Sequence, residues 1–335
     1  MAVFWFKVGR RYLMNNLDFI NFFDSIEDDS LTVLKGLDSK TQKKINSKYF
    51  YDEKGSILFD KITKLDDYYP SKIECEILEK NKDSIRKMLP SNSVIIEFGS
   101  GSNQKIKKLL NAVEKPIEYI PIDISKEFLF KNAKDSAKDF PNLKIKAICA
   151  DFNQIDVLQS IIGRKKSKIG FFPGSTVGNY SPDDAKKLLI NFSKILGDES
   201  YLVIGVDLKK NIEVLEKAYN DSKGITAEFN KNILNGVNKI CGTIFDSKLF
   251  YHKAFFNKEK SRIEMHLVSK KKQIVEILNT KIHFKEGETI HTENSYKYTL
   301  SRFQNLAELS NFEIIDVLKD ERSFFGVFIL KVKSI

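Results

Sequence analysis

The sequence is poor in the residues that build disulfide frameworks and metal sites. Among 335 residues there are 3 cysteines and 4 histidines. Cys75, Cys149 and Cys241 lie far apart and form no Cys-x-x-Cys pair, and no His-Glu-x-x-His motif occurs. We therefore expect neither a disulfide framework nor a metal site. The absence of a disulfide framework is typical of proteins of the reducing cytoplasm, where we expect this protein to act.

Long apolar runs, internal repeats and low-complexity segments are missing as well. A membrane-spanning helix needs about 18 or more consecutive apolar residues, and no run in this chain approaches that length. We therefore expect no membrane partner. With 42% hydrophobic and 30% charged residues, the composition is that of a globular protein and not of a disordered chain.

The chain is basic, with a formal net charge of +10. A basic balance is compatible with nucleic-acid binding. However, the lysines are spread along the whole chain instead of forming one block. This distribution favours a lysine-rich surface, and we expect no nucleic-acid partner.

Residues 91–209 alternate between strand and helix patterns. We predict a strand, a glycine turn and a helix over 91–113, and further strands at 117–125, 144–152, 167–179 and 201–208. Strands that alternate with helices at this spacing predict a doubly wound α/β sheet. After 209 the pattern changes to helices and a meander of strands, and the chain closes with a helix and a hairpin. The polar segment 15–48 is predicted to be helical.

The segment IIEFGSGSNQK at 95–105 places Gly99 and Gly101 directly after a buried strand. Glycine lets the backbone approach a ligand closely at the carboxyl edge of such a sheet. Gln104 stands where the third glycine of a dinucleotide fingerprint would be, so this fingerprint fails. An acidic residue before Gly-x-Gly, without the third glycine, is more typical of S-adenosylmethionine sites.

The following strand ends bring more polar groups to the same edge. Asp123 can accept hydrogen bonds from ribose hydroxyls. Asp151 can take an adenine amino group, and Phe152 can pack on the ring. The segment FFPGSTVGN at 171–179 adds small residues and an amide. Asn179 can either cap the following helix or orient an amine or a carboxylate.

The segment HTENSYKYT at 291–299 pairs a carboxylate with a hydroxyl. Glu293 and Ser295 lie two residues apart, so in an extended strand both side chains point to one face. Taken alone, the segment is typical of a solvated edge. Opposite the glycine crevice, the pair could instead contact a bound molecule.

At this point the sequence resembles the histidine-specific methyltransferases that make trimethylhistidine for ergothioneine biosynthesis. The resemblance covers the chain from about 45 to 335 and leaves out the first 14 residues. It rests on YFYDEKGSILFDKIT, DDYYPS, EFGSGSNQK, PIDIS, ADF, FFPGSTVGN, AYNDSKGITAEFNKNIL, EMHLVS and HTENSYKYT.

The resemblance implies a class I, Rossmann-like methyltransferase sheet with an inserted α+β substrate-recognition domain. Residues 1–73, 93–209 and 298–335 would form the methyltransferase domain. Residues 74–92 and 210–297 would form the recognition domain, in agreement with the change of pattern after 209. The cofactor would be S-adenosylmethionine, and its binding residues would be Gly99, Gly101, Lys105, Asp123, Asp151 and Phe152.

The resemblance also implies a substrate pocket for one free amino acid. The α-amino and α-carboxylate end would be held by Asn179 and Tyr219, and the imidazole by Glu293 and Ser295. Further pocket residues would be Tyr51, Tyr68 or Tyr69, Gly174, Thr226 and Met265. Of these, Tyr51 and Asn179 would carry catalysis by placing the amine, and Tyr51 and Phe50 could favour a cation through their π faces. Without the resemblance, Tyr51 and Tyr219 would be ordinary core tyrosines.

The activity implied is methyl transfer from S-adenosylmethionine to the α-amino group of L-histidine, up to trimethylhistidine (hercynine). A free α-amino group has a pKa of about 8, so a usable neutral fraction exists at pH 7 without a strong base. The alternatives are the same fold acting on another amino acid or a modified histidine, and a nucleic-acid methyltransferase. FPGS at the end of the fourth strand speaks against the last. We expect a monomer.

Overall fold

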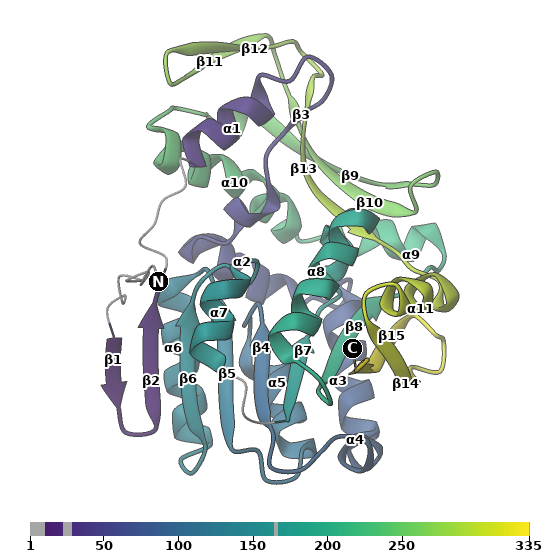
Figure 1. Ribbon diagram of the computed structural model, residues 1–335. Helices are drawn as coiled ribbons and strands as arrows, with labels where there is room; N and C mark the ends of the chain where they lie inside the picture. The colour runs from purple at the N-terminus through teal and green to yellow at the C-terminus, as the bar shows by residue number, and fades with distance from the viewer. Residues whose placement is uncertain (1–10, 23–28, 164–166, 335) are drawn as a thin grey trace.

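The computed structural model describes residues 11–22, 29–163 and 167–334 (Figure 1). Its main layer is a 9-stranded sheet. The strands are β1 (Arg11–Met14), β2 (Leu17–Asn21), β4 (Val94–Phe98), β5 (Glu118–Asp123), β6 (Lys144–Cys149), β7 (Lys168–Phe172), β8 (Tyr201–Asp207), β14 (Phe312–Lys319) and β15 (Phe325–Val332). They are ordered β1-β2-β6-β5-β4-β7-β8-β15-β14.

The centre of this sheet is parallel. Strands β2, β6, β5, β4, β7 and β8 all run in one direction, whereas β15 lies antiparallel between β8 and β14. Segments such as VIIEF and KIGFF are buried throughout, as expected for strands covered on both faces. The strand order reverses between β4 and β7, and ligands of open α/β sheets bind at such a switch point. The predicted class I, Rossmann-like sheet is confirmed.

Helices cover both faces of the sheet and form two apolar cores. One face carries α3 (Tyr69–Lys80), α4 (Lys82–Met88), α5 (Asn103–Ala112) and α6 (Lys126–Asp139). The other carries α7 (Ile155–Ile162), α8 (Pro182–Leu196) and α11 (Leu300–Glu308) (Figure 1). Adjacent strand residues divide between the cores: Ile95 packs in the first and Ile96 in the second, as the alternation of side chains requires.

A second part of the molecule lies over the carboxyl ends of the parallel strands (Figure 1). It contains a 4-stranded sheet in the order β3-β13-β10-β9 and a separate hairpin, β11-β12. Its strands are β3 (Lys43–Lys44), β9 (Phe250–Asn257), β10 (Arg262–Ser269), β11 (Gln273–Ile277), β12 (Thr280–Phe284) and β13 (Thr289–Tyr296). Its helices are α1 (Asp29–Leu37), η1 (Ser47–Phe50), α2 (Glu53–Ile62), α9 (Ile212–Lys217), α10 (Ile225–Cys241) and η3 (Ser247–Leu249).

The contacts between elements suggest where the chain divides. Helix α10 contacts α1, η1 and α2 as well as β9 and β10. Helices α3 and α4, which cover most of residues 74–92, contact α5, and α3 also contacts β15 of the large sheet. We therefore propose that residues 29–62 belong with 212–296 in the recognition part, and that 69–88 belong with the large sheet.

The prediction of helix over 15–48 was only partly right. Residues 29–37 are helical, but Leu17–Asn21 form β2, which pairs in parallel with β6. All five residues of β2 are buried. The strand pairs with the neighbouring β1 and also with β6, more than a hundred residues away, and local propensity does not reveal the second partner. No helix within the described ranges is long and apolar enough to span a bilayer.

Candidate active site

The glycine turn after β4 leaves room for a ligand at the switch point. Gly99 has φ +75°, a left-handed conformation that favours glycine. The backbone N–H groups of Gly99 and Ser100 both donate to the Ile122 carbonyl at 2.9 Å, which ties the turn to β5. A Cβ atom placed on Gly101 would meet no heavy atom within 4 Å. Helix α5 begins just beyond, so its N-terminal N–H groups face the same space.

The two strand-end carboxylates predicted from the sequence flank this turn. Asp123 ends β5, where its Oδ1 accepts from the Ser125 N–H at 2.8 Å, and burial raises its pKa to about 6. Asp151 follows β6 and accepts from the Asn153 N–H at 2.9 Å. The half-buried ring of Phe152 lies 3.8 Å from the position of a Cβ on Gly99. Open space, a carboxylate and an aromatic face fit the tail, ribose and adenine of S-adenosylmethionine.

Lys105 is held by a carboxylate that the sequence analysis missed. Its Nζ pairs with Glu74 Oε2 at 2.7 Å, and the Glu74 side chain is fully buried. The Gly174 N–H donates to the same carboxylate at 2.9 Å. A Cβ on Gly205 would lie 2.0 Å from Glu74 Oε1, so a side chain at this position would displace Glu74. Glu74 thus joins the predicted cofactor lysine to the predicted substrate loop.

Strand β13 is extended, as predicted, and presents Glu293 and Ser295 on one face. Met265 of β10 pairs directly with Glu293 and therefore lies on the same face. The register between β10 and β13 shifts after Met265. The shift leaves Thr292 as an extra residue, and its single hydroxyl hydrogen is shared between Asn230 Oδ1 at 2.7 Å and the Met265 carbonyl at 3.0 Å. This bulge fixes which side chains of β13 face the site.

The Glu293 carboxylate is surrounded by tyrosines. Burial raises its pKa to about 7, although Lys297 acts in the opposite direction. Burial, together with the charge of Glu293, also raises the pKa values of Tyr51, Tyr68 and Tyr219 well above normal. Across residues 11–22, 29–163 and 167–334, no group donates a hydrogen bond to this half-buried carboxylate. The Glu293 carboxylate can therefore accept a hydrogen bond from a molecule bound beside it.

Ser295 belongs to a buried hydrogen-bond network. Its Oγ accepts from the Tyr219 hydroxyl at 2.7 Å and from Lys297 Nζ at 2.8 Å. Lys297 also pairs with Asp207 Oδ2 at 2.7 Å. Burial opposes ionisation of Asp207, but Lys297 and Lys210 outweigh it and hold the pKa of Asp207 below its usual value. The two hydrogen bonds from Tyr219 and Lys297 fix the position of the Ser295 hydroxyl.

The structure separates Tyr68 from Tyr69, which the sequence left open. The ring of Tyr68 meets that of Tyr219 edge-on at 6.3 Å, next to Glu293. The Tyr69 hydroxyl instead donates to the Asp207 carboxylate at 2.8 Å and accepts from Lys210 at 2.8 Å. Tyr68 therefore lies with Glu293 and Tyr219, whereas Tyr69 supports the network behind them.

The loop after β7 lies against β13 and carries Asn179. Asn179 ends η2 (Thr176–Asn179), and a Cβ on Gly178 would lie 2.8 Å from the Tyr296 carbonyl of β13. Helix α8 is capped by Ser181, so Asn179 is not its cap. Within the described part of the chain the Asn179 amide has no hydrogen-bond partner, and it is free to bind a ligand.

The remaining predicted pocket residues occupy different positions. Gly174 has φ +78°, and a Cβ there would lie 3.4 Å from Lys105 Nζ. Thr226 is buried in the first turn of α10, where its N–H donates to Asp221 Oδ1 at 2.7 Å. The expectation that Phe50 presents a π face to a cation was wrong. Phe50 is fully buried and stacks on Phe229 with ring centroids 4.5 Å apart.

Three residues that the sequence analysis missed carried usable signals. Lys297 is the next same-face position after Glu293 and Ser295 in HTENSYKYT. Asp207 ends the fifth predicted strand, as Asp123 ends the second. Glu74 is a charged residue among the apolar positions of IECEIL. All three are at most 1% exposed, and a buried charge usually has a paired role.

The opposite face of the small sheet carries the nearest approach to a metal site in the described ranges. Glu264, His266 and His291 bring ligand atoms within 4.8 Å of one another. The two imidazoles stack at 4.7 Å with 12° between their planes, so their lone pairs run side by side and do not converge. Glu264 is already paired with Arg262 at 2.6 Å. This cluster does not have the geometry of a metal centre.

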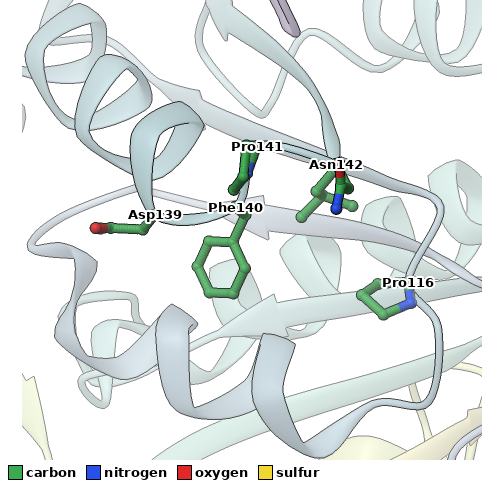
Figure 2. Close-up of a pocket in the computed structure, with 6 residues that line it drawn as sticks. Pro116, Asp139, Phe140, Pro141 and Asn142 are labelled. Atoms are coloured by element: carbon green, nitrogen blue, oxygen red, sulfur yellow. The ribbon is translucent and has the colours of Figure 1, made fainter.

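A pocket of 270 Å³ lies elsewhere, at the amino ends of β5 and β6 (Figure 2). Its residues are Pro116, Asp139, Phe140, Pro141, Asn142 and Leu143. It contains none of the residues predicted for the site. In doubly wound sheets ligands bind at the carboxyl ends of the strands, and this pocket lies at the other end.

Comparison with known proteins identifies the family. The family profile described as "Histidine-specific methyltransferase, SAM-dependent" matches residues 27–332. A "Histidine N-alpha-methyltransferase" of Mycobacterium tuberculosis is 33% identical over 271 residues, which are 79% of this chain and 83% of that protein. One of Mycolicibacterium smegmatis is 34% identical over 261 residues, 76% of this chain and 80% of that protein.

A longer relative points the same way. "Ergothioneine biosynthesis protein 1" of Schizosaccharomyces pombe is 28% identical over 295 residues, 85% of this chain but 38% of that protein. The resemblance stated from the motifs is thus confirmed over nearly the whole chain. This protein is an S-adenosylmethionine-dependent enzyme and belongs to the family of histidine-specific methyltransferases.

Proposed function

We propose that this enzyme transfers methyl groups from S-adenosylmethionine to the α-amino group of L-histidine, up to trimethylhistidine. The observation that carries the proposal is the pair Glu293 and Ser295 on one face of β13, where Met265 of β10 is the cross-strand neighbour of Glu293. The names of the relatives, which refer to histidine and to ergothioneine biosynthesis, support it. Ergothioneine biosynthesis is therefore the pathway that we propose for the product.

The pair matches a neutral imidazole, which has one N–H donor and one bare acceptor nitrogen. The unpartnered Glu293 carboxylate accepts from the N–H. The Ser295 hydroxyl, which already accepts from Tyr219 and Lys297, serves the other nitrogen. An apolar or indole side chain would leave these polar groups unsatisfied, at a cost of roughly 1–3 kcal/mol per group.

The amino-acid end of histidine would lie between β13 and the η2 loop. We assign the free amide of Asn179 and the hydroxyl of Tyr219 to the α-amino and α-carboxylate groups. Gly174 and Thr226 shape the walls, and Tyr68 lines the pocket at the ring. The rings of Tyr51 and Phe229 make a T-shaped contact with centroids 6.0 Å apart, which helps to hold Tyr51 near Glu293. Tyr51 and Asn179 then act by orienting the amine.

Catalysis in this arrangement is mainly placement. S-adenosylmethionine supplies an electrophilic methyl group when bound. The α-amino group needs no strong base, since its pKa of about 8 leaves a neutral fraction at pH 7. Holding the amine in line can replace much of the entropic cost of the reaction. The faces of Tyr51 and Tyr68 favour the ammonium that grows with each methylation.

The cofactor would occupy the edge of the large sheet. We propose that Gly99 and Gly101 border its methionine tail, that Asp123 accepts from the ribose, and that Asp151 and Phe152 bind the adenine. Lys105 lies beside the tail, where Glu74 holds it at 2.7 Å. All of these residues and the substrate residues come from one chain, and we infer a monomer. The chain has only 3 cysteines, which are far apart in the sequence, and this supports action in the reducing cytoplasm.

The test is a methyl-transfer assay of the purified protein against the free amino acids, read by mass spectrometry. Three added methyl groups on histidine alone would support the proposal, whereas no transfer to histidine would refute it. Transfer to another amino acid or to a modified histidine would point to the alternative substrates. A parallel assay with RNA at modest salt would detect the nucleic-acid alternative, which predicts RNA methylation.

A further inference from the structure

Lys297 directly follows β13 on the same face as Glu293 and Ser295, and every N–H group of its ammonium is used. Its side chain is fully buried, and its ammonium has three hydrogens. They reach Asp207 Oδ2 at 2.7 Å, Ser295 Oγ at 2.8 Å and the Tyr219 hydroxyl at 3.2 Å. Asp207 is fixed in turn by the Tyr69 hydroxyl at 2.8 Å and by Lys210. The ammonium therefore cannot turn without breaking a buried ion pair.

These contacts determine which part of the Ser295 hydroxyl is left to bind a ligand. A serine hydroxyl has two lone pairs and one hydrogen. Both lone pairs are occupied, because Lys297 and Tyr219 each donate to Ser295 Oγ. The hydrogen of Ser295 is the group left for a bound molecule. We propose that Lys297 is a positioning residue that makes Ser295 a hydrogen-bond donor to the bare ring nitrogen of the substrate.

This inference rests on the proposed function and deepens it, since it says which kind of ring the site selects. Glu293 accepts and Ser295 donates, so the ring must offer one N–H and one bare nitrogen. A ring with an N–H but no second nitrogen would leave the Ser295 hydrogen unpaired. Without Lys297, the Ser295 hydroxyl could turn and would discriminate less between the two rings.

Lys297 also has an electrostatic role at the same site. It is the charged group that favours ionised Glu293. The other titratable groups around Glu293 are Tyr51, Tyr68 and Tyr219, all with raised pKa values, and none of them supplies a positive charge. On the far face of β13, His291 donates from Nε2 to the Glu293 carbonyl. Loss of Lys297 should thus raise the pH at which Glu293 ionises.

The experiment compares Lys297→Met with Lys210→Met. Both changes remove one of the two ammonium groups from Asp207, but only Lys297 contacts Ser295 and Tyr219. Each variant is assayed with histidine and with its pyrrole analogue, which keeps a ring N–H and lacks the second nitrogen. For Lys297→Met, kcat/KM for histidine should fall about 10- to 100-fold, whereas kcat/KM for the analogue should change little. The acidic limb of the pH profile should also move to higher pH.

Lys210→Met should preserve both the preference for histidine over the analogue and the position of the acidic limb. If Lys297 has a purely structural role, Lys297→Met should lower kcat/KM equally for histidine and for the analogue, or should give the same result as Lys210→Met. Either result would overturn the inference. If Lys297→Met does not fold, Lys297→Gln decides. It keeps neutral N–H donors, so the preference should persist while the acidic limb moves, and equal losses on both rings would refute the inference. If the unaltered enzyme does not methylate histidine, the proposed function itself fails.

Discussion

The carboxyl edge of the large sheet and strand β13 form the two sides of the proposed site by different means. At the sheet edge the backbone provides the geometry, through the left-handed Gly99 and the open space before Gly101. On β13 the side chains provide it, because Ser295 is fixed by Tyr219 and Lys297. A cofactor shared by many enzymes can be bound by backbone geometry, whereas choice among amino acids requires a specific set of side chains.

Asp123 and Glu293, the two half-buried carboxylates of the site, show the same difference. Burial raises the pKa of Asp123 to about 6 and that of Glu293 to about 7. Asp123 already accepts from the Ser125 N–H at 2.8 Å. Glu293 has no donor anywhere in the described ranges. The Glu293 side should therefore depend more strongly on its ligand, and substitutions should affect the two sides separately.

Glu293→Ala should show the largest difference between its effects on substrate binding and on cofactor binding. This change removes a charged acceptor from the proposed imidazole, so kcat/KM for histidine should fall about 10- to 100-fold or more. The Kd for S-adenosylmethionine, measured by calorimetry, should hardly change. Asn294→Ala is a matched control, because Asn294 pairs with Glu264 on the opposite face of the same strand. Equal losses of both ligands in Glu293→Ala would show that the pocket assignment is wrong.

A second substitution acts on the cofactor side through packing. In Gly205→Ala the new Cβ would lie 2.0 Å from Glu74 Oε1, so Glu74 must move away from Lys105 and Gly174. Overpacking of this kind costs about 1–3 kcal/mol of unfolding free energy, and binding of S-adenosylmethionine should weaken as well. Gly101→Ala is the contrast: no heavy atom lies within 4 Å of its Cβ. Its melting temperature should stay unchanged while cofactor binding weakens, and a destabilised Gly101→Ala would contradict this arrangement.

The third substitution, Asp123→Asn, is the counterpart of Glu293→Ala. An amide can still contact a ribose hydroxyl, but the charge that strengthens the hydrogen bond is lost. We expect the Kd for S-adenosylmethionine to rise roughly 10-fold, which corresponds to about 1.4 kcal/mol, with KM for histidine unchanged at saturating cofactor. Fluorescence or calorimetric titration measures the Kd for S-adenosylmethionine, and steady-state assays measure the KM for histidine. A larger effect on histidine than on the cofactor would reverse the assignment of the two sides.

The large sheet and its edge were predictable because their signals are local. The apolar runs that end at Phe98, Asp123 and Cys149 mark the parallel strands, and the turn residues mark the ligand edge. The strand β2 was missed, although its pairing with β1 is local; its pairing with β6 is distant in the sequence. Pairing with a remote strand overrides a local helical pattern.

The small sheet was predictable only in part. Alternation in HTENSYKYT placed Glu293 and Ser295 on one face, and the same rule extended by two residues would have found Lys297. The rule alone would also have put His291 on that face. The bulge at Thr292 moves His291 to the other face, opposite His266, and it depends on a hydrogen bond to Asn230 of α10. Such a bulge is set by tertiary contacts and not by the strand pattern.

The smallest predicted effect is on the free energy of unfolding. It distinguishes Glu293, a carboxylate proposed to bind substrate, from a carboxylate that stabilises the fold. The pKa of Glu293 is raised from 4.5 to about 7, so the folded chain binds this proton more tightly than the unfolded chain. The folded state therefore loses stability as the pH rises from about 4.5 to about 7, and the loss is complete above that range. Glutamine does not titrate. Glu293→Gln should raise the unfolding free energy at pH 8 by on the order of 1 kcal/mol and change it little at pH 5.

Glu288, just before β13, provides the matched control of opposite sign. Its carboxylate pairs with Lys43 at 2.6 Å, and although burial opposes ionisation, this partner holds the pKa of Glu288 below its usual value. Its stabilisation is present above the pKa of the unfolded chain and is lost as the pH falls. Glu288→Gln should therefore lower the stability at pH 8 by less than about 1 kcal/mol. Chemical denaturation at the two pH values measures both variants. Opposite shifts at pH 8 would show that ionised Glu293 lowers stability, as expected for a carboxylate kept for substrate binding. Shifts in the same direction would contradict this interpretation.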